Sequence, residues 1–205
     1  MRKLDTHTWN RKQIFDHFRQ LIDPYFGVVI PFDVTKAYRF AKEQNVSFFV
    51  RYLHDCMKAV NTIENFRLRI INDDVVDYET IHASATIMRD DKTFGFSFIK
   101  FNEDFQIFNK NFEIEKERIQ NSNELFPPVY SEDCIHCSAL PWFTFTSQKE
   151  PSSGRQASVP EIAFSKFTNQ NEKLIMNVSV HVNHALVDGY HVGLFSEKFQ
   201  FYLNT

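Results

Sequence analysis

The last third of the chain has the most regular pattern of apolar and polar positions. Apolar and polar side chains alternate there: Leu174, Met176, Val178, Val180 and Val182 against Asn177, Ser179, His181 and Asn183. This period of two predicts a strand with one buried face. Beyond a short turn the apolar positions follow helical spacing at Val192, Phe195, Phe199 and Tyr202. The pattern predicts a C-terminal amphipathic helix.

Similar patterns predict helices and strands earlier in the chain. Helical spacing appears over residues 10–21, 35–44 and 103–123, and a further helix of about four turns begins after Ser47. Strand patterns cover residues 28–34, 68–71, 75–78, 82–88 and 143–147, the last an alternation of Phe and Thr. Strands and helices without strict alternation favour an α/β or α+β sandwich. Residues 148–160 are polar and predict a long loop within one domain spanning 1–205, rather than a domain boundary.

Composition narrows the function classes. The chain has 205 residues, of which 43% are apolar and 24% charged, as in an ordinary globular domain. Its 26 acidic and 23 basic residues give a net charge of −3, which argues against a dedicated nucleic-acid binder. No apolar run reaches the roughly 20 residues of a membrane span, and the N-terminus lacks a signal-peptide pattern. We therefore expect a cytoplasmic protein without a membrane partner.

Phenylalanine and cysteine are the unusual residues. The 23 Phe residues indicate a Phe-rich core, with some rings free to line a pocket or a subunit interface. Cys56, Cys134 and Cys137 are an odd number of thiols, and a reduced state fits them best. Cys134 and Cys137 have metal-ligand spacing, but no second Cys/His pair lies nearby to complete a zinc site.

The segment from Asn183 to His191 carries the strongest chemical signal. His184 follows the predicted strand, and Asp188-Gly189 precedes the last helix. Histidine is the side chain best suited to move protons near neutral pH. An ordinary histidine and an Asp serving as helix N-cap explain the same residues. A third alternative is the two-His, one-carboxylate set of a non-haem iron site, made by His184, Asp188 and His191.

Four ordered motifs resemble the chloramphenicol acetyltransferase family. The segment from His184 to Phe195 contains the His-x-x-x-Asp-Gly signature of coenzyme A-dependent acyltransferases. The other motifs are Trp9-Asn10-Arg11, then residues 48–71 with Asn65-Phe66-Arg67, and Ser138-Ala139-Leu140-Pro141-Trp142. Together they cover nearly the whole chain in the family's order.

The resemblance implies a fold, an assembly and a reaction. The fold is a two-layer α/β sandwich with a mixed β-sheet covered by helices. The assembly is a homotrimer whose active sites lie between subunits. The reaction is acetyl transfer from acetyl-CoA, a co-substrate, to a hydroxyl of a small molecule, with chloramphenicol as the named acceptor and antibiotic resistance as the role. It implies no metal.

The resemblance also assigns roles to individual residues. His184 is the general base, and Ser138 stabilises the oxyanion of the tetrahedral intermediate. Asp188 pairs with Arg11, far away in the sequence, and this pair fixes the turn that presents His184. Trp142, Phe49, Lys166 and Phe167 fall where the family contacts coenzyme A. Tyr25, Phe26 and Phe94 fall where it lines an aromatic acceptor pocket.

Three departures from the family pattern concern the acceptor. Asn183 stands where a second His is common, and Ala163 stands where the family has a Thr near the transition state. Residues 148–159 include Lys149, Glu150 and Arg155, whereas drug-acetylating members are apolar there. Three hypotheses follow: a chloramphenicol acetyltransferase, a relative that acetylates another small alcohol, and a non-catalytic trimer that binds a ligand.

Overall fold

A six-stranded mixed sheet forms one layer of the fold. The computed structural model describes residues 1–129, 131–151 and 157–205. The strand order is β2 (Tyr25–Asp33), β9 (Lys173–Asn183), β8 (Glu161–Gln170), β7 (Cys134–Leu140), β5 (His82–Met88) and β6 (Phe94–Phe96). The β5–β7 and β7–β8 pairs are parallel, and the other neighbours are antiparallel. The expected mixed sheet is confirmed.

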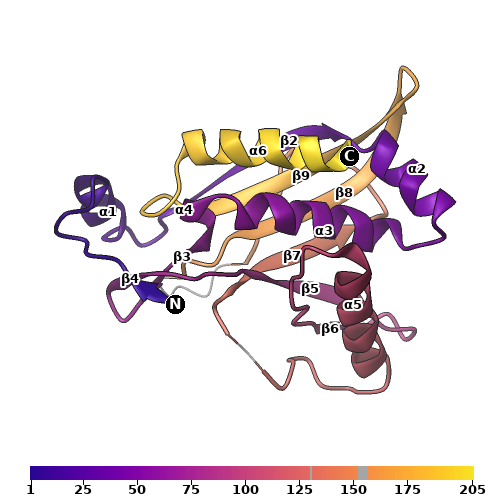
Figure 1. Cartoon of the computed structure of the whole chain (residues 1–205), viewed down its shortest axis with the longest axis horizontal. Helices are drawn as coiled ribbons and strands as arrows, with labels where there is room; N and C mark the ends of the chain where they lie inside the picture. The colour runs from indigo at the N-terminus through magenta and orange to yellow at the C-terminus, as the bar shows by residue number, and fades with distance from the viewer. Residues whose placement is uncertain (130, 152–156) are drawn as a thin grey trace.

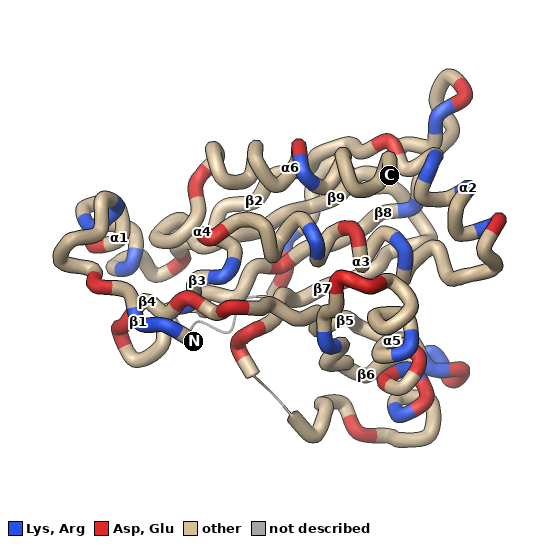
Figure 2. The backbone as a smooth tube through the Cα atoms, in the orientation of Figure 1, with Lys and Arg blue, Asp and Glu red and all other residues tan. Residues whose placement is uncertain are grey.

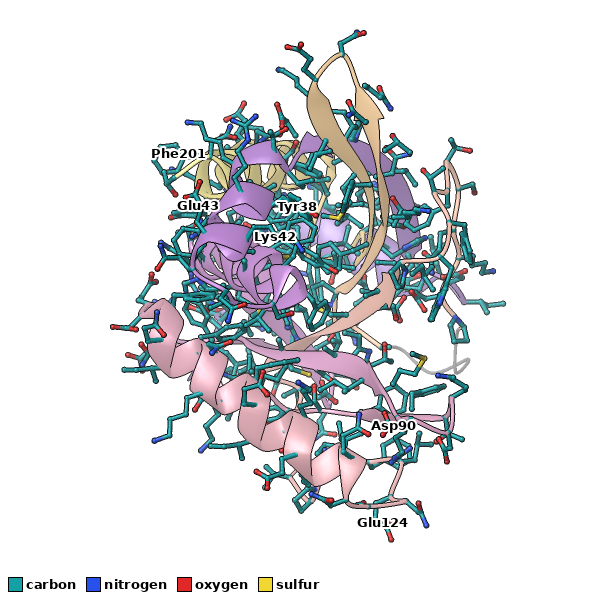
Figure 3. The ribbon with its side chains drawn as sticks, turned by 90° about the vertical axis from the view of Figure 1, so that its right-hand side faces the viewer. Tyr38, Lys42, Glu43, Asp90, Glu124 and Phe201 are labelled. Atoms are coloured by element: carbon teal, nitrogen blue, oxygen red, sulfur yellow. The ribbon has the colours of Figure 1, made fainter. Side chains whose placement is uncertain are left out.

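Helices cover one face of this sheet, as Figure 1 and the perpendicular view in Figure 3 show. They are α2 (Thr35–Glu43), α3 (Phe48–Asn61), α5 (Phe105–Gln120) and α6 (Gly189–Leu203), with the short α4 (Glu64–Arg67) directly after α3. Helix α1 (Lys12–Phe18) lies apart from this layer, beyond the end of the sheet (Figure 1). Val178, Val180 and Val182 of β9 are fully buried beneath the helices, together with Phe195 and Phe199 of α6. The period-two pattern of β9 and the helical pattern of α6 thus meet in one core.

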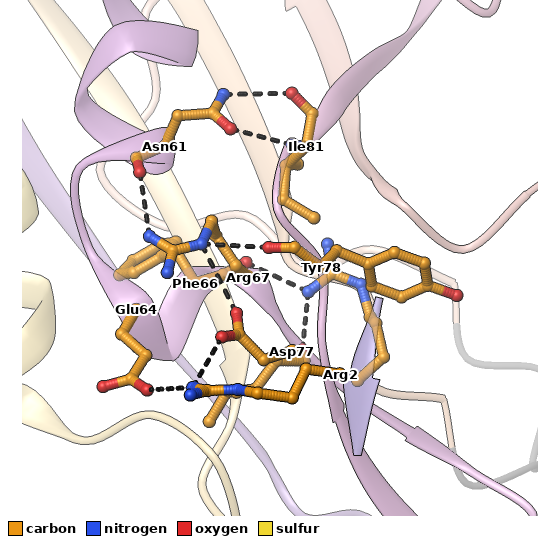
Figure 4. Close-up of polar contacts among 10 residues, drawn as sticks. Arg2, Asn61, Glu64, Phe66, Arg67, Asp77, Tyr78 and Ile81 are labelled. Carbon is orange, nitrogen blue, oxygen red and sulfur yellow. Dashed lines mark hydrogen bonds and ion pairs between the residues drawn. The ribbon is translucent and has the colours of Figure 1, made fainter. Parts of the chain in front are cut away.

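A second, three-stranded sheet lies beside the first, in the order β1 (Arg2–Lys3), β4 (Asp74–Asp77), β3 (Leu68–Ile71). Figure 4 shows the polar contacts that join it to the end of α3. Arg67 donates to the carbonyls of Tyr78 and Asn61 at 3.0 Å each, and Asp77 accepts from Arg2 at 3.0 Å. These contacts fix α4, which carries a residue of the candidate site described below.

Most predicted elements are confirmed within a few residues, but one is wrong. Residues 143–147 form no strand, although they run beside β8. Only the Lys166 N–H to Phe143 carbonyl bond joins the backbones of the two segments. Pro141 cannot donate a ladder hydrogen bond, and Phe143 is 53% exposed although Phe145 is buried, so the Phe/Thr alternation does not bury one whole face. The strands β7 and β8, by contrast, were not predicted, because their sequences show no clear alternation of apolar and polar residues.

The described surface carries charges of both signs, interspersed over α5 and around the β8–β9 turn (Figure 2). None of the helices in the described part of the chain is long and apolar enough to cross a membrane. Of the predicted loop at 148–160, residues 148–151 and 157–160 are described. Arg155 lies outside the described residues.

Candidate functional site

His184 lies where β9 ends and the chain turns towards α6. The β2–β9 pairing reaches Tyr25 and Asn183, and the His184 N–H donates to the Pro24 carbonyl at 2.9 Å. The Asn183 carbonyl accepts from the N–H groups of Leu186 and Val187, at 3.0 Å each. The turn is therefore hydrogen-bonded on both sides of His184. Such a turn holds a side chain at the edge of a rigid sheet.

Two phenylalanine rings contact the His184 imidazole. Phe18 of α1 stacks on it with a centroid distance of 4.0 Å and an interplanar angle of 6°, and Phe26 of β2 lies at 4.7 Å. The Nδ1 atom is buried and has no hydrogen-bond partner among the described residues. Nε2 is therefore the nitrogen that could reach a substrate. Phe26 was a predicted acceptor residue, whereas Phe18 lies in the predicted helix 10–21, and its helical spacing gave no signal that it would contact His184.

The predicted ion pair between Arg11 and Asp188 is confirmed. Arg11 Nη1 lies 2.5 Å from Asp188 Oδ2, across 177 positions of sequence. Asp188 is also the N-cap of α6, because its side chain accepts from the Tyr190 N–H at 3.0 Å. Burial pushes the pKa of Asp188 up, but the hydrogen bond and charge of Arg11 outweigh it and hold that pKa below its usual value. One carboxylate thus joins α1 to the start of α6.

Two asparagines brace the same turn. Asn65 of α4 donates to the Leu186 carbonyl at 2.7 Å. Asn183 is buried, donates to the Ala157 carbonyl at 2.9 Å and accepts from the Ala185 N–H at 2.9 Å. Asn183, which stands where the family often has a second His, therefore places a hydrogen-bonded amide next to His184. The sequence motif Asn65-Phe66-Arg67 gave no indication that Asn65 would contact this turn.

Ser138 lies in a different part of the chain's surface. It is in β7, paired with Ala163 of β8, and it lines a cavity of about 200 Å³. Phe96 lines the same cavity, and the ring of Phe94 lies 5.6 Å from that of Phe96. Phe94 itself is 47% exposed. The structure thus brings Ser138 and Phe94 near one another, but not near His184.

Strand register gives the separation of His184 and Ser138 within one chain. Ser138 pairs with Ala163, Ala163 pairs with Ser179, and His184 lies five residues beyond Ser179. Two strand spacings and five strand residues place the two side chains roughly 20 Å apart. No hydrogen-bonded arrangement can join them in one chain, because a catalytic pair acts at about 3 Å.

A larger cavity, of about 530 Å³, lies beside the Ser138 cavity. Tyr25 lines it, and the Tyr25 hydroxyl donates to the Val159 carbonyl at 2.8 Å. The two cavities share a wall made by His136, Glu150 and Glu161. Burial, with the charge of Glu150 next, raises the pKa of Glu161 to about 7. Burial lowers the pKa of His136. Sequence patterns gave no signal for His136 or Glu161 as cavity residues.

The residues assigned to coenzyme A lie on α3 and at the β7–β8 end of the sheet. Trp142 is 60% exposed just after β7. Phe49 contacts Phe112 and Tyr52, with ring centroids 5.7 and 5.5 Å away. Phe167 contacts the ring of Tyr38, which lies between α2 and the sheet (Figure 3). Lys166 is exposed on β8. Exposed aromatic and Lys side chains can hold a nucleotide-containing ligand by stacking and phosphate contact.

The metal alternatives find no geometric support in the part of the chain that the structure describes. No group of three or more His, Cys, Asp or Glu side chains there could hold a metal ion. Asp188 and His191 form a capping box at the start of α6, whereas His184 contacts Phe18 and Phe26. Cys134 and Cys137 are buried in β7, and burial raises the pKa of both thiols, that of Cys134 to about 12.

Comparisons with known proteins identify the family. The sequence model of the family described as chloramphenicol acetyltransferase matches residues 1–200. The chloramphenicol acetyltransferase of Bacillus pumilus is 33% identical over 190 residues, covering 91% of this chain and 86% of the relative. Chloramphenicol acetyltransferase 3 of Escherichia coli is 25% identical over 206 residues, covering 99% of this chain and 97% of the relative.

Solved structures give the same result. A chloramphenicol acetyltransferase structure superposes with a TM-score of 0.89 at 26% identity, covering 98% of this chain and all of that one. The truncated catalytic core of the 2-oxoacid dehydrogenase complex from Thermoplasma acidophilum shares the fold, with a TM-score of 0.71, 14% identity, and coverage of 99% and 98%. From the match over nearly its whole length, this chain belongs to the chloramphenicol acetyltransferase family.

Proposed function

We propose that the protein is one cytoplasmic catalytic domain that transfers the acetyl group of acetyl-CoA to a hydroxyl of a small molecule, with chloramphenicol as the named acceptor. The observation that carries this proposal is the hydrogen-bonded turn that holds His184 between Phe18 and Phe26. Family membership supplies the reaction class. The Arg11–Asp188 pair supports the role of the turn, because it ties α1 to α6 directly after it.

His184 acts as general base in this proposal. Its neutral imidazole takes the proton of the acceptor hydroxyl as that oxygen attacks the thioester carbonyl of acetyl-CoA. A tetrahedral oxyanion forms and then collapses, the C–S bond breaks, and the proton passes to the departing coenzyme A sulfur. Ser138 donates a hydrogen bond to the oxyanion.

The separation of these two residues supports sites between subunits, and the family resemblance implies that the assembly is a homotrimer. Because His184 and Ser138 are roughly 20 Å apart in one chain, they can act on one substrate only when they come from two copies. The cavity beside Ser138 would then be closed by His184 of a neighbouring copy. Trp142, Phe49, Lys166 and Phe167 would contact coenzyme A, and Tyr25, Phe26 and Phe94 would contact the acceptor.

A specific observation favours an acceptor other than chloramphenicol as the best substrate. The wall of the Ser138 cavity carries Glu150, Glu161 and His136, and Ala163 offers no hydroxyl beside Ser138. Apolar contact stabilises a bound aromatic ring by about 25 cal/mol per Å² of buried area, and a polar wall supplies less of it. A non-catalytic trimer is disfavoured, because His184, Ser138, Asp188 and Arg11 are all present.

The test is release of free coenzyme A thiol from acetyl-CoA in the presence of a panel of alcohols that includes chloramphenicol. We expect chloramphenicol to be acetylated with a kcat/KM well below the diffusional range of about 10⁷–10⁸ M⁻¹s⁻¹. A value within that range would make this an efficient resistance enzyme and refute the weak-acceptor hypothesis. Thiol release with none of the alcohols would refute the acetyl-transfer proposal itself.

A further inference from the structure

One row of side chains crosses five strands on the sheet face opposite the helices. The register pairs Ser84 of β5 with His136 of β7, His136 with Glu161 of β8, Glu161 with His181 of β9, and His181 with Gly27 of β2. Residues in register point to the same face of a sheet. Their strand neighbours Ile162 and Val180 face the core instead, where they are buried.

Gly27 at the end of the row makes space for His181. A Cβ atom on residue 27 would lie 2.3 Å from the His181 ring, so only glycine permits the present position of that imidazole. His181 Nδ1 lies 3.1 Å from the Ser179 hydroxyl, which in turn donates to Gln148 Oε1 at 3.2 Å. The Gln148 amide donates to Glu150 Oε1 at 2.6 Å. This chain of hydrogen bonds fixes the Glu150 carboxylate at the cavity wall.

Two polar side chains of the Ser138 cavity, Ser84 and Glu161, lack a hydrogen-bond partner among the described residues. Ser84 lines the cavity and is only 8% exposed, yet its hydroxyl has no hydrogen-bond partner among the described residues. Within the described parts of the chain, the Glu161 carboxylate likewise has no hydrogen bond or ion pair. The described lining of this cavity includes no Lys or Arg, and Lys149 lines the adjoining larger cavity. Buried polar groups are almost always hydrogen-bonded. Unpartnered ones that line a cavity therefore point to a ligand.

The charge and shape of the cavity indicate the chemistry of that ligand. Glu150 and Glu161 place two carboxylates on one wall, and burial together with the charge of Glu150 raises the pKa of Glu161. The lining also contains Phe96 and Phe126, whose rings lie 5.5 Å apart. Carboxylates and aromatic faces both attract an organic cation. Ser138 lies two residues along the strands from this acidic wall, roughly 7 Å, so one small molecule can contact both.

We infer that the preferred acceptor is a small alcohol carrying a protonated amine, bound with its ammonium group between Glu150 and Glu161 and its hydroxyl near Ser138. This inference rests on the proposed function, because it assigns the acceptor class of the same acetyl-transfer site. The amine supplies the missing counter-charge and can donate to Glu161. The Ser84 hydroxyl can form a further hydrogen bond with the same molecule.

The test compares two acceptors that share one diol and one aromatic ring. They are chloramphenicol and the free amine made by removing its dichloroacetyl group. We expect the wild type to prefer the amine in kcat/KM, with O-acetylation identified by mass spectrometry. Glu161→Gln and Glu150→Gln keep the side-chain shape and should lower the amine-to-chloramphenicol ratio about 10- to 100-fold, the usual worth of a charge-assisted hydrogen bond. Glu197→Gln, exposed on α6, is the matched control and should leave the ratio unchanged.

Calorimetric titration of the amine into the protein gives a readout independent of turnover. Binding by the wild type that is lost in Glu161→Gln supports the acidic site, even if no acetyl transfer occurs and the proposed function fails. Acetylation of chloramphenicol with no preference for the amine overturns this inference and leaves the proposed function intact. An amine preference that survives both Gln substitutions overturns the inference as well.

Discussion

Replacing Asp188 by Asn removes one negative charge while keeping the shape of the side chain and its ability to cap α6. In the native chain Asp188 accepts from Arg11 at 2.5 Å, with side-chain exposures of 27% and 11%. The Nε and Nη2 atoms of Arg11 are buried without a partner among the described residues. The substitution therefore leaves a largely buried guanidinium without its counter-charge.

The expected loss of stability lies between two limits. Breaking a fully buried ion pair on one side costs about 3–5 kcal/mol, whereas an exposed pair contributes about 0–1 kcal/mol. Because Asp188 is partly exposed and Asn can still accept a hydrogen bond, we expect a loss of about 2 kcal/mol. For a chain of 205 residues this lowers Tm by about 4–8 °C. Asp188→Ala also removes the helix cap and should cost about 1 kcal/mol more.

Urea unfolding measures this loss, with all variants at one protein concentration because subunit association changes apparent stability. Asp90→Asn, on the exposed turn between β5 and β6 (Figure 3), is the control and should stay within about 0.5 kcal/mol of the wild type. Arg11→Met combined with Asp188→Asn should cost less than the sum of the single losses. We also expect kcat to fall at least about tenfold in Asp188→Asn, because the turn that holds His184 is loosened.

Acid provides a second check on the same pair. The pKa of Asp188 in the folded chain lies below its usual 3.8. The stability that the Asp188 carboxylate contributes is therefore fully present above its usual pKa. This stability is lost as the pH falls through the lower pKa of the folded chain. The stability gap between the wild type and Asp188→Asn should narrow below about pH 4. Equal stability of the two at pH 7, with additive losses in the double variant, would refute the assignment of this ion pair.

Two further predictions concern the active site and the sheet. His184→Ala should cut turnover about 10²–10⁴-fold with the fold intact, and Ser138→Ala should lose about 10²-fold. Refolding the two variants together should restore about a quarter of the wild-type activity, because random mixing pairs an intact His184 with an intact Ser138 at one interface in four; no recovery would contradict sites shared between subunits. Gly27→Ala should destabilise the chain by about 1–3 kcal/mol by overpacking the His181 ring. Adding His181→Ala should recover most of that loss in a thermal melt, and no recovery would show that the ring is not the obstacle.

Local sequence determined the elements with strong periodicity. The alternation in β9 and the helical spacing in α3 and α6 predicted elements that the structure contains within a few residues, since each pattern matches one geometric period and buries one face. The segment 143–147 alternates as regularly and is not a strand. Phe145 is buried but Phe143, on the same side of the pattern, is exposed, and Pro141 interrupts the ladder beside β8. Periodicity alone could not distinguish these cases, because burial depends on what packs against the segment.

The motifs around His184 and Arg11 also led from the sequence to a pair that the structure contains, across 177 positions. What only the tertiary structure decided is the environment of these residues. Phe18 stacks on His184 because α1 returns to the end of β9. Glu161 and His136 share a cavity wall because β7 and β8 pair in parallel, residue 136 opposite 161. Strand register between distant segments is set by the packing of the whole sheet, and no local pattern encodes it.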